Sequence, residues 1–141
     1  MVRLINRYEL SIDDKGRLVL PAPHRERYAD GAVLASRGDH IAVYEPGVWD
    51  EFVALLTERR INRELTRTDF NLITMHAADL QPDSAGRIVI PAWMRQEIGL
   101  EDKALVAGVT DYLAIYPGMF LSSVGQPARR GAFEKIDEMG L

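Results

Sequence analysis

An aspartate and an arginine stand four residues apart around a glycine in this chain, in the segment Asp13-Asp14-Lys15-Gly16-Arg17. A carboxylate placed across a tight turn from a guanidinium can hold it by hydrogen bonds and fix its direction. An arginine held in this way at a loop suits the O6 and N7 atoms of guanine in the major groove of DNA, or a phosphate group. Lys15 would add a phosphate contact beside it. The residue types and their spacing therefore make this turn a candidate for nucleic-acid binding.

The same arrangement returns 70 residues later as Asp83-Ser84-Ala85-Gly86-Arg87. Aligning residues 10–28 with 80–98 gives eight identical pairs: Leu10/Leu80, Asp13/Asp83, Gly16/Gly86, Arg17/Arg87, Val19/Val89, Pro21/Pro91, Ala22/Ala92 and Arg25/Arg95. A single pair of this kind is more often a solvated surface pair that stabilises little. Repetition of the whole set favours two related binding sites instead. Ala85 occupies the position of Lys15, so we expect the first turn to bind more strongly.

Short strands are predicted on both sides of each turn, over residues 8–12 and 17–20 in the first copy and 77–81 and 87–90 in the second. Gly16 and Gly86 can adopt the positive φ that a tight turn requires, which favours a hairpin at each place. Pro21 and Pro91 then end the strands and begin short helices. A second hairpin follows in each copy, over 33–36 and 41–44, and over 104–109 and 112–116.

Each copy thus has the order strand, turn, strand, short helix, strand, strand, and each is too small to enclose a core alone. We therefore expect an α+β, β-rich fold in which two copies share one core about a pseudo-twofold axis. The predicted divisions are a first repeat at 6–50, a helical connector at 51–76, a second repeat at 77–121 and a tail at 122–141. A helical stretch over about 63–75 is expected within the connector. The tail has the composition of a linker up to Gly131 and a weakly helical end.

Composition narrows the class of protein. The chain has 141 residues, of which 47% are hydrophobic and 27% charged, as in ordinary globular proteins. It has no cysteine, which excludes disulfides and thiolate metal sites and favours an intracellular setting. No apolar run is long enough to span a bilayer, and the N-terminus has no signal-peptide core, so no membrane is expected. The formal net charge is −4, yet residues 59–67 hold four basic side chains against one acidic one, so basic patches remain for an anionic partner.

Other chemistry-bearing residues carry weaker signals. The histidines His24, His40 and His76 show no metal-ligand spacing, and the chain has no nucleophile elbow or phosphate-cradling loop, so we expect neither an enzyme nor a cofactor or metal. Arg25 and Arg95 recur on the short helices, where they would contact phosphate or cover apolar neighbours. Four basic residues of the connector would lie on a solvated or subunit-facing helix, or form an electrostatic rim on DNA: Arg59, Arg60, Arg63 and Arg67. Three aromatic residues are expected to be core or subunit-interface anchors: Trp49, Trp93 and Phe120.

The paired motif, Asp-x-x-Gly-Arg followed by three apolar residues and a proline, resembles the MraZ family of bacterial transcriptional regulators over about residues 1–120. These proteins are related to the AbrB-type swapped-hairpin DNA binders. The resemblance implies a swapped-hairpin, AbrB-like barrel and a ring-shaped homo-oligomer. It also implies binding to double-stranded DNA at short direct repeats in promoters of the division and cell wall gene cluster. The family's signature maps onto Asp13 and Arg17 and onto Asp83 and Arg87. Asn6 departs from the glycine usual in the family.

The sequence therefore favours a DNA-binding transcriptional regulator in the cytoplasm, associated with the nucleoid, and a repressor whose targets include its own operon. Its expected DNA-binding residues are Asp13, Lys15, Arg17, Asp83 and Arg87. The alternative is a β-rich, antitoxin-like interaction module that binds an acidic protein through the same arginine loops. AbrB-like antitoxins usually carry one motif copy, so two copies argue against that relationship. A small-molecule sensor has no site in this sequence.

Overall fold

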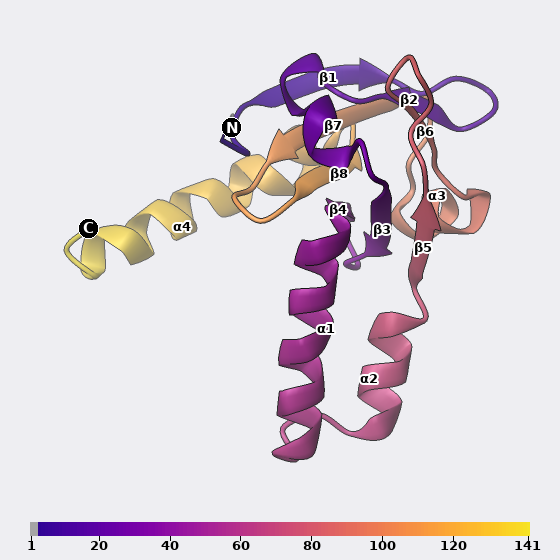
Figure 1. Cartoon of the computed structure of the whole chain (residues 1–141). Helices are drawn as coiled ribbons and strands as arrows, with labels where there is room; N and C mark the ends of the chain where they lie inside the picture. The colour runs from indigo at the N-terminus through magenta and orange to yellow at the C-terminus, as the bar shows by residue number, and fades with distance from the viewer. Residues whose placement is uncertain (1–2) are drawn as a thin grey trace.

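The strands of the two copies are interleaved in one β-rich body (Figure 1). A computed structural model describes residues 3–141. Six strands form one sheet in the order β1-β7-β8-β4-β3-β5, and β2 pairs with β6 in a separate two-stranded ribbon. The strands are β1 Arg7–Ser11, β2 Arg17–Val19, β3 Ala32–Ser36, β4 Ile41–Tyr44, β5 Ala77–Leu80, β6 Arg87–Val89, β7 Lys103–Gly108 and β8 Leu113–Pro117. This confirms the predicted α+β, β-rich and internally duplicated fold.

Six helical segments connect or follow the strands within residues 3–141. They are the 3₁₀ helix η1 Ala22–Tyr28, α1 Pro46–Ile61, α2 Arg67–Thr74, α3 Ala92–Ile98, a π-helical turn η2 Leu121–Gly125, and α4 Gln126–Glu138. Gly99 is the C-cap of α3 and has a φ of 70°. The helix expected over 63–75 begins only at Arg67. Thr66 caps it by accepting a hydrogen bond from the Asp69 amide, and Arg63 has a φ of 63°, outside the helical range.

Strand pairing exchanges partners between the two copies. β1 of the first copy pairs antiparallel with β7 of the second, from Arg7 opposite Ala107 to Ser11 opposite Lys103. β5 of the second copy pairs in the same way with β3 of the first. The hairpin expected between the strands flanking each Gly turn is therefore wrong: the turn forms, but its two strands pair elsewhere. The β3–β4 and β7–β8 hairpins do form as predicted.

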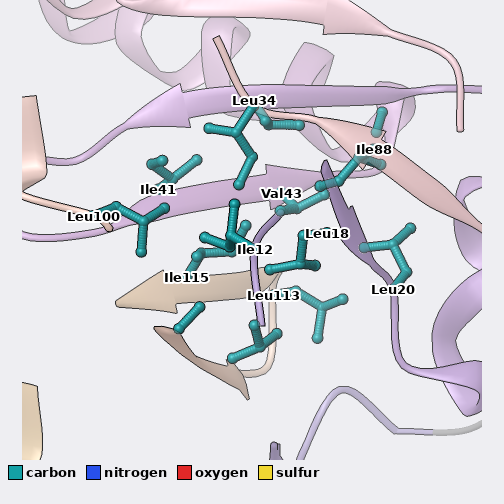
Figure 2. Close-up of a cluster of buried hydrophobic side chains, with 14 of the residues drawn as sticks. Ile12, Leu18, Leu20, Leu34, Ile41, Val43, Ile88, Leu100, Leu113 and Ile115 are labelled. Atoms are coloured by element: carbon teal, nitrogen blue, oxygen red, sulfur yellow. The ribbon is translucent and has the colours of Figure 1, made fainter. Parts of the chain in front are cut away.

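The main core lies between the sheet and the ribbon and draws on both copies. Leu18 of β2 and Ile88 of β6 face each other across the ribbon, and both side chains are buried. They pack with Leu34, Val43 and Leu113 from the sheet, as Figure 2 shows. Fully burying one such side chain stabilises a fold by roughly 1.5–3 kcal/mol. One face of the ribbon thus packs on the core, and its other face is exposed to solvent.

The opposite face of the sheet is partly covered by α1. Trp49 and Phe52 of this helix pack on Tyr44 of β4, with ring centroids 5.5 and 5.7 Å apart. Phe120 stacks on Tyr116 at 4.0 Å. Trp49 and Phe120 are therefore packing anchors, as expected, whereas Trp93 on α3 is 41% exposed. From this face α1 and α2 project together as a helical hairpin (Figure 1).

The C-terminal segment is helical where the sequence predicts a linker. η2 and α4 follow one another from Leu121 to Glu138, and α4 extends away from the body (Figure 1). No residue of α4 is buried. Pro127 lies in its first turn, where proline is tolerated, so this residue does not interrupt the helix. No helix within residues 3–141 is both long and apolar enough to cross a membrane.

Candidate nucleic-acid interface

The first Gly turn is organised around the carboxylate of Asp13. Its Oδ1 accepts hydrogen bonds from the backbone amides of Lys15, at 3.0 Å, and Arg17, at 2.9 Å. Its Oδ2 accepts one from Nε of the Arg17 guanidinium, at 2.6 Å. The Gly16 amide also donates to the Asp13 carbonyl, at 3.0 Å. One carboxylate therefore holds both the turn and the arginine side chain that the turn carries.

The second turn repeats this geometry. Asp83 accepts from the amides of Ala85 and Arg87, each at 2.9 Å, and from Nε of Arg87 at 2.6 Å. The two turn glycines, Gly16 and Gly86, have φ values of 79° and 78°, a region that L side chains rarely adopt. The expected contact between each aspartate and its arginine is thus present in both copies.

Both carboxylates are held in their charged form. Hydrogen bonding from the Arg17 backbone amide, followed by the Arg17 guanidinium, lowers the pKa of Asp13 below its ordinary value. The Arg87 amide and guanidinium lower the pKa of Asp83 in the same way. Each aspartate therefore stays ionised at neutral pH and keeps its hold on the arginine.

Each arginine is held at Nε and open at its other end. Its Nη1 and Nη2 atoms make no hydrogen bond to any group within residues 3–141. The side chains of Arg17 and Arg87 keep 34% and 42% of their surface exposed. The terminal N–H groups of each guanidinium therefore point in a fixed direction and are free to bind an acceptor.

The two arginines share the outer face of the ribbon. Arg17 lies opposite Val89 and Val19 lies opposite Arg87, while Leu18 and Ile88 between them point into the core. Arg17 and Arg87 are thus diagonal neighbours, a relation that typically separates Cα atoms by about 7–8 Å. A two-stranded ribbon of this kind fits the major groove of B-DNA, which is about 12 Å wide.

Some residues of this surface are not predicted from the sequence. Val19 and Val89 are 43% and 55% exposed on the same face as the two arginines, where the sequence predicts only strand positions. Their identity at the offset of 70 and their spacing of two from the arginines could have placed them there. Arg25 and Arg95 hydrogen-bond through Nε to the carbonyls of Leu20, at 2.8 Å, and Ile90, at 3.1 Å, and do not simply cover apolar neighbours.

The other candidates differ in where they lie relative to this surface. The two copies differ at Lys15 and Ala85, both exposed, so only the first turn carries an extra cation. Residues 3–141 contain no group of three histidine, aspartate or glutamate side chains that could hold a metal ion. Arg59 of the connector pairs with Glu64 at 2.8 Å, and Arg60 lies over the ring of Phe70. These two basic residues thus contact other residues of the helical hairpin and not the ribbon.

The exchanged strands, the shared core and the two arginine turns define an internally duplicated α+β protein whose two copies swap strands. Comparison with known proteins then gives the family. Residues 4–71 and 73–119 match the sequence model of the family described as "MraZ protein, putative antitoxin-like". The chain therefore belongs to the MraZ family.

Relatives with the name "Transcriptional regulator MraZ" match over most of their length. The protein of Roseiflexus castenholzii is 35% identical over 113 residues, which cover 79% of each chain. That of Herpetosiphon aurantiacus is 34% identical over the same share. The protein of Mycobacterium tuberculosis is 31% identical over 110 residues, or 77% of each chain. The family match ends at residue 119, so α4 lies beyond it.

Proposed function

We propose that this protein is a sequence-specific DNA-binding transcriptional regulator that reads base edges with Arg17 and Arg87. One observation carries the proposal: two guanidiniums lie on the outer face of one ribbon, each held by an aspartate at Nε and open at Nη1 and Nη2. Holding an arginine in advance reduces the ordering that binding must impose on it. A free surface arginine would gain no such advantage.

The guanidinium edge suits guanine. Nη1 and Nη2 can donate together to O6 and N7, an arrangement worth about 1–3 kcal/mol of discrimination against a wrong base. Lys15 would contact the phosphate backbone beside the first turn, which positions the protein without reading sequence. Asp13 and Asp83 would serve by orienting the arginines, since a carboxylate facing the phosphates directly would be repelled.

One chain offers only two such turns, so several chains acting together would bind far more tightly. We therefore propose a ring-shaped homo-oligomer whose subunits each engage one copy of a short direct repeat. The targets would be promoters of the division and cell wall gene cluster, including the protein's own operon, and the effect repression. Such a regulator would act in the cytoplasm at the nucleoid. The resemblance to relatives named transcriptional regulators supports this proposal.

A footprint of the purified protein on the region upstream of its own gene tests the proposal. Arg17→Ala and Arg87→Ala should each weaken binding by about tenfold or more and reduce discrimination between that region and random DNA. Arg130→Ala is the matched control. It removes the same charge from an arginine that is 90% exposed on α4. Equal effects of the three variants would show that only net charge matters.

A second candidate function is an interaction module that grips an acidic protein through the same arginines. The antitoxin-like description of the family favours it. Such a module would bind DNA weakly and without sequence preference. Equal affinity for the upstream region and for random DNA would therefore favour this function over transcriptional regulation.

A further inference from the structure

Each Gly turn is covered by an arginine from the other copy. A Cβ atom added to Gly86 would lie 2.6 Å from Cδ and Nε of Arg25, which belongs to η1 of the first copy. A Cβ added to Gly16 would lie 2.8 Å from Cζ and Nε of Arg95, on α3 of the second copy. The missing side chain of each glycine thus makes room for the arginine in addition to allowing the positive φ.

The two arginines are fixed at the base of the ribbon. Nε of Arg25 donates to the Leu20 carbonyl at 2.8 Å, and the Leu20 amide donates to the Gly86 carbonyl at 2.8 Å. In the second copy, Nε of Arg95 donates to the Ile90 carbonyl at 3.1 Å, and the Ile90 amide donates to the Gly16 carbonyl at 2.9 Å. Each connection runs from the arginine through its own strand to the turn of the other copy.

This arrangement gathers more cationic than anionic side chains around the ribbon. Four arginines border the ribbon, Arg17, Arg25, Arg87 and Arg95. Lys15 adds a fifth cation, and the turns themselves carry three carboxylates, those of Asp13, Asp14 and Asp83. The whole chain has a formal charge of −4, so the excess is local. Cations gathered in one place repel one another, so an anion that binds among them is favoured.

We propose that each DNA-contacting turn is a composite of both copies, in which Arg95 is a positioning residue for the Asp13–Arg17 turn and Arg25 for the Asp83–Arg87 turn. The DNA part of this inference rests on the proposed function, whereas the crossed support of the turns does not. A helix arginine that only covers its apolar neighbours would act within its own copy. The two interpretations therefore predict opposite patterns of damage.

Limited trypsin digestion without DNA measures the support directly. Trypsin cleaves after Lys15 and Arg17 in the first turn and after Arg87 in the second, and it needs the turn to open locally. Arg95→Ala should speed cleavage at Lys15 and Arg17 about fivefold and leave Arg87 unchanged, because one hydrogen bond and its packing are lost. Arg25→Ala should do the reverse. Mass spectrometry of the fragments gives each rate.

Conservative variants separate positioning from charge. Arg95→Lys keeps the charge but has neither the Nε donor nor the planar group, so it should behave as Arg95→Ala does. Arg95→Met keeps the apolar stem and guards against general unfolding, and circular dichroism checks each fold. Arg130→Ala should leave both turns as resistant as before. Rescue by lysine, or faster cleavage within the mutated copy only, would overturn the composite turn.

Binding to the upstream DNA completes the test through double-mutant cycles. Arg17→Ala and Arg95→Ala should be non-additive, because both disable the first turn, whereas Arg17→Ala and Arg25→Ala should multiply their separate losses. If Arg17→Ala leaves DNA binding intact while the crossed digestion pattern holds, the proposed function fails and the composite turn stands. Additivity of the first pair alongside a loss for Arg17→Ala would mean that Arg95 does not act through Arg17.

Discussion

Asp13 is an anionic side chain in a surface proposed to bind a polyanion, and this contradiction makes its role measurable. Replacing it with asparagine removes a negative charge, which by electrostatics alone should strengthen DNA binding. The Asp13 carboxylate, however, accepts three hydrogen bonds, including the one from Nε of Arg17. We predict that Asp13→Asn weakens binding to the upstream DNA about fivefold, because an amide oxygen holds the guanidinium less firmly. Fluorescence anisotropy at fixed salt measures the affinity.

Asp14 provides a matched control for that prediction. It is the next residue, it is exposed, and its side chain makes no hydrogen bond within residues 3–141. Asp14→Asn removes the same charge without loosening the arginine, so it should leave affinity unchanged or raise it. Equal effects of the two substitutions would show that Asp13 acts only through its charge.

The same carboxylates predict a pH dependence. The pKa values of Asp13 and Asp83 are lower in the folded protein than their ordinary value of 3.8. A group with a lowered pKa adds stability above its unfolded pKa and loses it as the pH falls through its folded pKa. The turns should therefore keep their order at neutral pH and lose it below pH 3.8. Carboxyl carbon NMR should show Asp13 and Asp83 titrating below 3.8, and midpoints at or above that value would contradict the hydrogen-bonded turn.

The residue types correctly predict the contact between aspartate and arginine in each turn. They do not predict every residue that contacts the turn. The contacts of Asp13 with Arg17 and of Asp83 with Arg87 could be predicted because they are local, four residues apart across one turn. The place of Arg95 against Gly16 could not, since 79 residues separate the two positions in the sequence. Only the repetition of Arg25 and Arg95 signalled a role, and repetition says nothing about which turn each one meets.

At the level of elements, the ribbon turn can be tested by adding one methyl group. Gly16→Ala brings a side chain into positive φ and into the guanidinium of Arg95, at 2.8 Å. Gly38→Ala brings the same kind of strain at a φ of 91°, but its Cβ meets nothing within 4 Å. We predict that both lower stability by about 1 kcal/mol through strain, and that only Gly16→Ala also weakens DNA binding. Chemical denaturation and anisotropy separate the two effects. Loss of DNA binding by Gly38→Ala would contradict this assignment.

Strand positions were predictable from the sequence, and strand partners were not. Alternation of apolar residues indicates which face of a strand is buried, and prolines and glycines mark its ends, so β2 and β6 lie close to their predicted bounds. Turn residues also suggest that neighbouring strands pair. Here Leu10 of β1 pairs with Ala104 of β7, a choice decided by packing in the shared core. Local chemistry cannot encode such a distant partner.

At the level of the whole molecule, the body and the C-terminal helix behave as separate parts. Residues 122–131 have the composition of a linker but are helical. Serine, glycine and an early proline are compatible with a first helical turn. Phe133 and Met139 of the C-terminal segment remain 52% and 68% exposed. The core, by contrast, is built from both repeats and ends with β8.

Removing residues 126–141 should therefore leave the body intact. Every residue of α4 is exposed, and the helix points away from the body in Figure 1, so few interactions that stabilise the core are lost. We predict a change in Tm within about 2 °C, as for surface changes in a domain of this size. Affinity for a short DNA carrying a single site should also be unchanged, because both arginine turns lie on the β2–β6 ribbon.

Calorimetry and anisotropy on the shortened protein check these expectations, and the solution mass shows whether α4 contributes to assembly. A loss of affinity confined to DNA with several repeats, together with a lower mass, would place the effect in the multivalent binding of the proposed ring. A fall in Tm of more than about 5 °C would instead mean that α4 packs against the body and supports the core. The two results affect different properties of the molecule, so one shortened protein distinguishes assembly from folding.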